Sequence, residues 1–423
     1  MIIIIIIVTG GFYMVNTKNP GQKQSLGQRA DKYLLNPYTG FPIMLLCFAA
    51  LFAASFILGK PVSNWLGLGL DYLVNIFETW SSAVHLPWLL TSLISNGIFR
   101  GIGSALAFFP QMLIFYVFYS AMNDTGYASR IAHIMNSPMS RLNMQGDAFA
   151  CLFLGYSCNV PAIVATRDIP RRLDRLIIML VSTFTPCSAR FGVILYIAAA
   201  FFSPLTATLV MTGLIGLSWL ISALVAYAIK SSFPRSESAG IKLTLPPLHR
   251  PNLRHVLKSA MIRTLDFLNK IKNVVIISAV VVWFLSSFPS NVGFEGSYIA
   301  IIGQSLEPLG RLAGLNWQLI VALLLGFFAK ETTLATLGVL YHASEGLGNL
   351  SAILATHISP LVGLTFLVIY MFYTPCLATV TTIWRESNSR SFAAFSVVIS
   401  LLLAFVLGTL VYQSGRLVLI LLA

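Results

Sequence analysis

The sequence predicts an all-α polytopic membrane protein, and three observations support this fold class. Hydrophobic residues make up 57% of the 423 residues, whereas charged residues make up only 10%. The mean hydropathy of +0.81 is too high for a soluble domain of this length. Several apolar stretches are long enough to cross a hydrocarbon core of about 30 Å, which takes roughly 20 helical residues. Helices are expected there because they satisfy their own backbone hydrogen bonds.

About eight transmembrane helices are predicted, four in each half of the chain. They are expected near residues 41–58, 105–122, 176–202, 205–229, 273–288, 317–340, 352–374 and 391–413. The predicted organisation is a short cytoplasmic N-terminal segment (1–40), a first membrane half (41–229), a basic cytoplasmic loop (230–272) and a second membrane half (273–423).

The net charge of +13 is interpreted as membrane orientation rather than nucleic-acid binding. The basic residues collect in short connections beside the spans, as the positive-inside rule and anionic lipid headgroups would require. The loop 230–272 is the most basic connection and is predicted to be cytoplasmic. One amphipathic helix is expected in this loop, lying in the membrane interface, either as a lipid anchor or as a docking surface for a regulator. Its apolar face is predicted to contain Leu253, Val256, Leu257, Ala260, Met261, Thr264 and Leu268.

An internal repeat is predicted, because each half carries a glutamine, an acid followed by threonine, a cysteine and an arginine in the same order. The members are Gln111, Asp124, Cys158 and Arg167 in the first half, and Gln318, Glu331, Cys376 and Arg385 in the second. The arginines are interpreted as anchors that reach toward the interface. The sequence leaves open whether the two halves are inverted or parallel.

Helix breaks are predicted at Pro161, Pro186 and Pro375, because proline removes a backbone donor and frees carbonyls of the preceding turn. Irregular backbone at membrane depth is tolerated only where it is buried in protein or lines a cavity, which makes each break a candidate binding site. Three of the five cysteines lie at these breaks: Cys158 in GYSCNVPA, Cys187 in FTPCSARF and Cys376 in YTPCLATV. Asn159 adjoins the first of them and is a further pathway candidate.

The chemistry of these breaks suits a borderline-soft divalent cation such as Fe(II). Thiolates bind such ions, and metal binding itself lowers the pKa of a thiol. Cys158, Cys187 and Cys376 are therefore predicted metal ligands, whereas Cys47 and Cys151 are interpreted as packing residues. An open site with two or three thiols would release its ion faster than a closed four-thiolate cage.

Ionisable residues inside spans are costly, so they are candidates for function. Lys330 and Glu331 interrupt a long apolar run in GFFAKETTLATLG. Glu331 is predicted to offer a carboxylate to the ion, and Lys330 a counter-charge, with a structural ion pair to another helix as the alternative. Asp124 is a weaker pathway candidate, because the end of a span also suits a solvated acid or a cap.

These motifs resemble the membrane domain of the FeoB family of ferrous iron transporters. The similar stretches are ADKYLLNPYTGFPIML, GIGSALAFFPQMLI, NDTGYASR, LGYSCNVPAIVATR, RRLDRL, PCSAR, GFFAKETTLATLGVLY and YTPCLATV. The resemblance implies two gate-type repeats with broken or re-entrant helices. It also implies Fe²⁺ uptake across a bacterial inner membrane, with iron-path cysteines at Cys158, Cys187 and Cys376. No permanently bound cofactor is expected.

The main departure from this family is the lack of a GxxxxGK[ST] phosphate loop. The chain is therefore expected to be a transporter rather than a GTP-hydrolysing enzyme, with a G domain supplied by a separate polypeptide or lost. The implied partners are the bilayer, a separate G protein, a small regulatory Feo-type protein or further copies of the chain, but not nucleic acid. The alternatives left open are a nucleoside or organic solute transporter and a non-transporting remnant.

Overall fold

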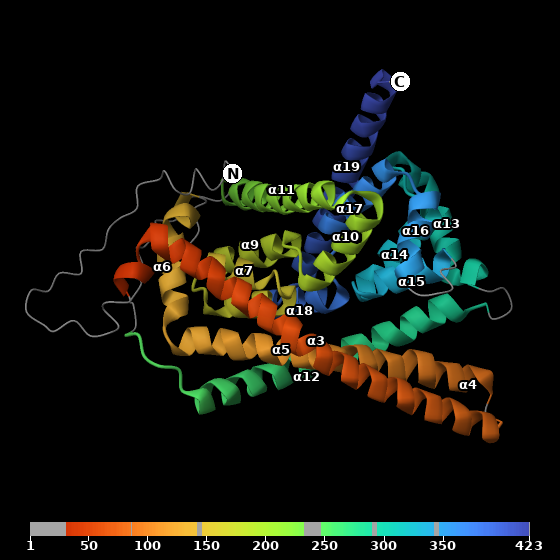
Figure 1. Cartoon of the computed structure of the whole chain (residues 1–423), viewed down its shortest axis with the longest axis horizontal. Helices are drawn as coiled ribbons and strands as arrows, with labels where there is room; N and C mark the ends of the chain where they lie inside the picture. Colours follow the sequence, from red (N-terminus) through yellow and green to blue (C-terminus); the bar gives the residue numbers. More distant parts are fainter. Residues whose placement is uncertain are drawn as a thin grey trace, which may run out of the picture.

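The computed structural model describes residues 31–85, 87–141, 146–231, 247–289, 294–341 and 347–422 (Figure 1). Within these ranges the chain forms helices and short connections, which confirms the all-α class. The first 30 residues of the predicted N-terminal segment and residues 232–246 of the predicted basic loop lie outside them.

Three long helices pack together along one side of the molecule: α3 (Pro37–Ala83), α5 (Arg100–Asp124) and α12 (Leu253–Ser287). The central one is α5, which contacts both of the others along much of its length (Figure 1). A proline at its first position and a side-chain cap from Asn36 to the Tyr38 N–H start α3. The short α4 (Trp88–Ser92) and a π-helical turn (Leu93–Phe99) lead from α3 into α5.

The remainder of the first half consists of shorter helices and one long one. They are α6 (Tyr127–Arg141), α7 (Asp147–Leu154), α8 (Asn159–Ala165), α9 (Arg172–Val181), α10 (Ser188–Phe201) and α11 (Pro204–Ser231). Two 3₁₀ turns follow α8 and α9, at Thr166–Asp168 and Ser182–Phe184.

The second half follows α12 and ends in one long helix. Its elements are a 3₁₀ turn (Phe294–Gly296), α13 (Tyr298–Gly310), a second 3₁₀ turn (Arg311–Ala313), α14 (Trp317–Phe328), α15 (Thr332–Leu340), α16 (Leu347–His357), α17 (Pro360–Phe372), α18 (Leu377–Ser387) and α19 (Arg390–Leu422).

In the part of the chain that the structure describes, six helical segments are long and apolar enough to cross a membrane. A seventh is possible by length if α13 and α14, which meet at 107°, count as one bent span. The number is smaller than the eight or so predicted, because the predicted spans 105–122 and 317–340 are not among the six. The first lies in α5, and the second is divided into α14 and α15. The predicted span 352–374 is represented by Pro360–Ser387, which begins later and continues into α18.

The predicted amphipathic helix is the first part of α12 rather than a separate element. Only part of its predicted apolar face is exposed. Val256 and Ala260 are buried, and Ala260 packs in a cluster with Phe115 of α5. Leu253 and Leu257 remain 73% and 56% exposed. The neighbouring α5 therefore covers the inner part of the face, which the sequence pattern alone could not reveal.

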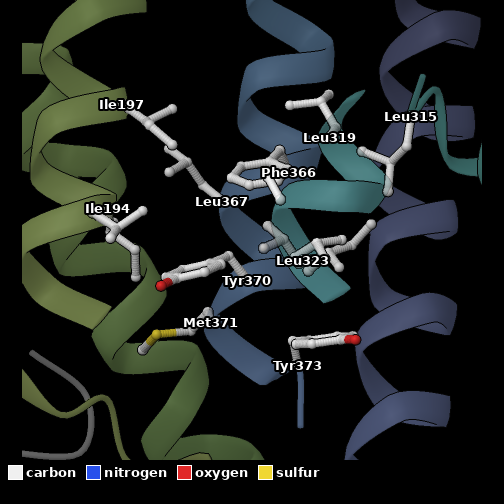
Figure 2. Close-up of a cluster of buried hydrophobic side chains, with 14 of the residues drawn as sticks. Ile194, Ile197, Leu315, Leu319, Leu323, Phe366, Leu367, Tyr370, Met371 and Tyr373 are labelled. Carbon is white, nitrogen blue, oxygen red and sulfur yellow. The ribbon is translucent and has the colours of Figure 1, made fainter. Parts of the chain in front are cut away.

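The largest hydrophobic cluster lies around α17 and includes residues from both halves of the chain. Figure 2 shows Phe366, Leu367 and Tyr370 of α17 between α10 on one side and α14 on the other. The flanking residues are Ile194 and Ile197 of α10, and Leu319 and Leu323 of α14. Helices from both halves of the chain thus share one core, and this core surrounds the ends of the broken helices.

Candidate metal site at the helix breaks

Four interruptions of helical backbone, here called the four breaks, carry most of the predicted site residues. They lie at 155–158, between α7 and α8; at 185–187, between α9 and α10; at 329–331, between α14 and α15; and at 373–376, between α17 and α18. In each, the chain leaves the helical conformation and resumes it within a few residues. Such ends present unpaired backbone donors and acceptors.

The first break places Cys158 in an extended conformation, with φ −156° and ψ 134°, immediately before α8. Asn159 then holds the break in place: with its amide oriented so that both polar atoms are satisfied, it donates to the carbonyls of Gly155 (3.0 Å) and Ser182 (3.2 Å). Pro161 is buried and lies in the first turn of α8, where its missing N–H has no intrahelical acceptor to lose. The sequence predicts that Pro161 frees carbonyls of a preceding helical turn. In the structure it instead belongs to the first turn of α8, directly after the break.

The second and fourth breaks share the sequence Thr-Pro-Cys. Pro186 and Pro375 each stand directly before a cysteine that caps the next helix, and proline favours an extended residue before it. Cys187 has φ −79° and ψ 169°, and Cys376 has φ −63° and ψ 156°. Neither thiol makes a side-chain cap to its helix, although Cys376 Sγ lies 3.1 Å from the hydroxyl oxygen of Thr379.

The third break separates the two charges that the sequence places side by side. Lys330 is buried, and its Nζ lies 5.3 Å from the ring centre of Tyr370 and 4.9 Å from that of Tyr373. No hydrogen-bond partner for this Nζ is found among the described residues, so the two aromatic faces supply its electrostatic contact. Glu331 instead stands at the N-cap position of α15 without a side-chain capping hydrogen bond, and its side chain is exposed rather than packed in the core. The alternative of a structural ion pair for Lys330 finds no support in the described residues.

One hydrogen-bonded network joins all four breaks. Ser188, which follows Cys187, donates from its N–H and its hydroxyl to the Ser157 carbonyl at 3.3 and 3.0 Å, and so ties the second break to the first. Arg190 donates to carbonyls of both Thr-Pro-Cys regions, which ties the second break to the fourth. Tyr370, near the end of α17, donates to the Lys330 carbonyl at 2.8 Å and brings in the third.

The predicted ligands accordingly lie in one neighbourhood. The hydrogen bonds of this network bring together the segments that carry Cys158, Cys187, Cys376 and Glu331. Each of these three thiols is only half-buried, so the space beside them is partly open. Among the described residues, however, no three His, Cys, Asp or Glu side chains are close enough together to hold an ion. The metal role of Cys158, Cys187, Cys376 and Glu331 stays a prediction.

The predicted pairing of residues between the halves stays a prediction, and the structure describes the local setting of its members. Cys158 and Cys376 each stand at the N-cap position of a short helix, α8 and α18, and these two helices pack against each other. Cys187 shares the Thr-Pro-Cys sequence with Cys376 and also precedes a helix, α10. Asp124 ends a continuous helix, α5, whereas Glu331 lies inside a break.

Two other charged residues, Asp124 and Arg167, make contacts outside the four breaks. Asp124 accepts a hydrogen bond of 2.9 Å from the Asn252 N–H just before α12, which fits a cap better than a pathway position. Arg167 was interpreted as an interfacial anchor, but it forms a two-bond ion pair with Glu386 of α18, with both N–O distances at 2.6 Å. Since α8 and α18 pack against each other, this pair fastens their ends together.

The remaining two cysteines lie outside the breaks. Cys47 is inside α3, and Cys151 is buried in α7 among apolar residues such as Phe149 and Ile178. Both positions agree with the packing role that we predicted.

Arg190 and Tyr370 belong to the site but were not predicted from the sequence. The sequence did contain a signal for Arg190, which stands three residues after a cysteine in the apolar run PCSARFGVILY. A charged residue at membrane depth is costly, so it is a candidate for function.

Comparison with known proteins agrees with this architecture. Residues 105–201 and 270–390 match the family described as "Gate: Nucleoside recognition". The chain is 32% identical to a Fe(2+) transport protein A/Fe(2+) transporter FeoB fusion protein of Porphyromonas gingivalis, over 93% of this chain and 52% of that protein. It is 29% identical to the Fe(2+) transporter FeoB of Methanocaldococcus jannaschii, over 95% of this chain and 60% of the relative. It is 32% identical to the Fe(2+) transporter FeoB of Synechocystis, over 91% of this chain and 62% of the relative. No solved structure matches.

Fold and site together define a polytopic α-helical membrane protein whose broken helices meet in one polar network. The chain belongs to the Gate family and corresponds to the membrane part of FeoB proteins. It spans about 52–62% of the length of the curated relatives described above.

Proposed function

We propose that this chain is a ferrous iron permease, which moves Fe²⁺ through the space beside the four breaks. The observation that carries the proposal is that three separate cysteine-bearing breaks are tied into one network. The names of the similar proteins support the choice of Fe²⁺ as the substrate. Thiol sulfur favours a borderline-soft ion over Mg²⁺ or Ca²⁺, which prefer oxygen ligands.

The proposed ligands are Cys158, Cys187 and Cys376, with Glu331 as an oxygen ligand at the edge of the site. Their thiols are half-buried, so an arriving ion can exchange water for sulfur one ligand at a time. An ion held in this way is also released more readily than one in a closed tetrahedral cage, which suits transport. Ion binding would draw the thiols closer together than they lie in this structure.

The wider cellular setting is also part of the proposal. We assign the chain to a bacterial inner membrane with residues 230–272 on the cytoplasmic side, because basic connections are retained there. We further propose that it hydrolyses no GTP by itself and responds to a G domain in the same or another polypeptide. The transport protein A part of the Porphyromonas gingivalis relative favours a small Feo-type partner as well.

The test is uptake of radioactive Fe²⁺ by a bacterial host that lacks its own ferrous iron system. Cys158→Ser, Cys187→Ser and Cys376→Ser should each lower uptake at limiting Fe²⁺ by about tenfold or more, since even residues that only orient a metal ligand contribute that much. Cys47→Ser, in α3, is the matched control and should transport normally. Equal tolerance of all four substitutions would contradict the proposed thiol site.

A second measurement separates iron transport from the solute-carrier alternative. The purified chain in nanodiscs should bind Fe²⁺ in the presence of millimolar Mg²⁺, because hard ions compete poorly for sulfur. Uptake should be measured both with and without a co-expressed G protein, so that a split system is not mistaken for an inactive one. Nucleoside uptake that does not depend on the three cysteines would favour the alternative.

A further inference from the structure

Arg190 lies in the first turn of α10, three residues after Cys187, and its side chain is completely enclosed by protein. Its guanidinium donates from Nη1 to the Thr183 carbonyl at 2.9 Å. From Nη2 it donates to the Tyr373 carbonyl at 2.5 Å and to the Thr374 carbonyl at 3.3 Å. These acceptors come from segments about 190 residues apart in the sequence.

The three carbonyls have related positions in the chain. Thr183 belongs to the turn that ends the α9 segment, and Tyr373 and Thr374 follow directly after the last residue of α17 (Figure 2 shows Tyr373). Carbonyls at the end of a helix have no intrahelical donor and carry partial negative charge. A planar guanidinium, with its donors in a fixed fork, can satisfy two such ends at once, whereas a lysine ammonium acts as a single point charge.

Each of these helix ends leads directly into Pro-Cys. Thr183 is four residues before Cys187, and Thr374 is two residues before Cys376. Arg190 is fixed to the Cys187 side by the α10 backbone and to the Cys376 side by its two hydrogen bonds to the α17 end. A short chain of covalent and hydrogen bonds therefore runs from the Cys187 side to the Cys376 side through this one side chain.

We propose that Arg190 is a positioning residue that sets the separation of the Cys187 and Cys376 thiols, and thereby the affinity of the site for its metal ion. The inference rests on the proposed metal path. It goes beyond that path because it assigns the control of ligand spacing to a residue that does not touch the ion. Ligands held by a firm outer support bind metal more tightly than ligands that must first be ordered.

The decisive measurement of spacing needs no iron. In a background with Cys47, Cys151 and Cys158 changed to serine, the two remaining thiols are treated in isolated membranes with bifunctional maleimides of graded length. The parent protein should react best with one narrow range of lengths. Arg190→Lys and Arg190→Gln should each broaden that range, because neither side chain can hold both helix ends in the same planar fork.

The functional measurement uses the chain with all its cysteines and, where needed, its G protein. Arg190→Lys should raise the KM for Fe²⁺ about tenfold or more while Vmax per folded molecule changes little, the pattern expected when ligand placement rather than the pathway is altered. Arg172→Lys, an exposed arginine of α9, is the control and should leave both constants unchanged. Arg190→Gln provides a second test if Arg190→Lys folds poorly.

The outcomes are distinct. An unchanged cross-linking profile in both variants would overturn the positioning role, as would a loss of folded protein with an unchanged KM in the molecules that remain. If the parent protein takes up no Fe²⁺ but the profile still broadens, the proposed iron transport fails while the spacing role of Arg190 stands.

Discussion

Replacing Tyr370 by phenylalanine tests whether the network around the third break stabilises the fold. The Tyr370 side chain is fully buried, and its hydroxyl donates to the Lys330 carbonyl at 2.8 Å and lies 3.3 Å from the Thr333 hydroxyl. Phenylalanine keeps the ring under the Lys330 ammonium but removes both contacts of the hydroxyl. Leucine at the same position would remove the ring as well.

The expected size of the effect follows from what remains at the break. A buried acceptor that loses its only donor costs about 1–3 kcal/mol. The Lys330 carbonyl, however, also accepts from the Thr333 N–H at 3.3 Å, so part of its hydrogen bonding survives. Hydrogen bonds between membrane helices average about 0.6 kcal/mol and reach about 1.7 kcal/mol. We therefore expect Tyr370→Phe to lower the free energy of unfolding by about 1 kcal/mol.

Tyr370→Leu should cost more than Tyr370→Phe, because it also removes one of the two aromatic faces beside the Lys330 ammonium. A desolvated cation–π contact contributes about 2 kcal/mol, so the two variants should differ by roughly that amount. The assay is thermal unfolding in detergent followed by intrinsic fluorescence, in which about 1 kcal/mol corresponds to a shift of roughly 1–3 °C.

A matched control is Tyr72→Phe in α3, because the Tyr72 side chain is 68% exposed. This substitution should leave the unfolding temperature unchanged. If Tyr370→Phe unfolds at the same temperature as Tyr72→Phe, or if leucine at position 370 is tolerated as well as phenylalanine, the hydroxyl and ring contacts do not stabilise the third break.

Two further predictions concern helix contacts. A Cβ at Gly408 would lie 2.3 Å from Cγ1 of Ile369, so Gly408→Ala should lower the free energy of unfolding by about 1–3 kcal/mol. Gly213→Ala meets nothing within 4 Å and should instead raise it by up to about 1 kcal/mol in the same unfolding assay. Arg167→Glu should destabilise the contact of α8 with α18, and adding Glu386→Arg should restore it. A double-mutant cycle should give about 0.5–1 kcal/mol, a modest value because the Arg167 side chain is 54% exposed; a coupling of zero would show that the pair contributes nothing.

The sequence predicted features that depend on neighbouring residues in the chain better than features that depend on distant ones. The proline and cysteine positions at the second and fourth breaks were predicted correctly as interruptions, because proline restricts the backbone of its immediate neighbours. Pro161 was misinterpreted, since the same residue starts a helix as readily as it breaks one. The charged pair Lys330 and Glu331 was recognised as unusual, but their separation into a buried ammonium and an exposed carboxylate was not.

The sequence by itself determined the all-α membrane class and three cysteines at helix interruptions. Hydropathy over some 20 residues and proline stereochemistry are local properties, so they can be read without knowing what lies nearby. Only the tertiary structure decided that Arg190 joins the ends of α9 and α17, that Arg167 pairs with Glu386, and that α5 covers part of α12. Each of these contacts joins residues that are far apart in the chain. Their energy depends on which helices pack side by side, and no local pattern of residues specifies that choice.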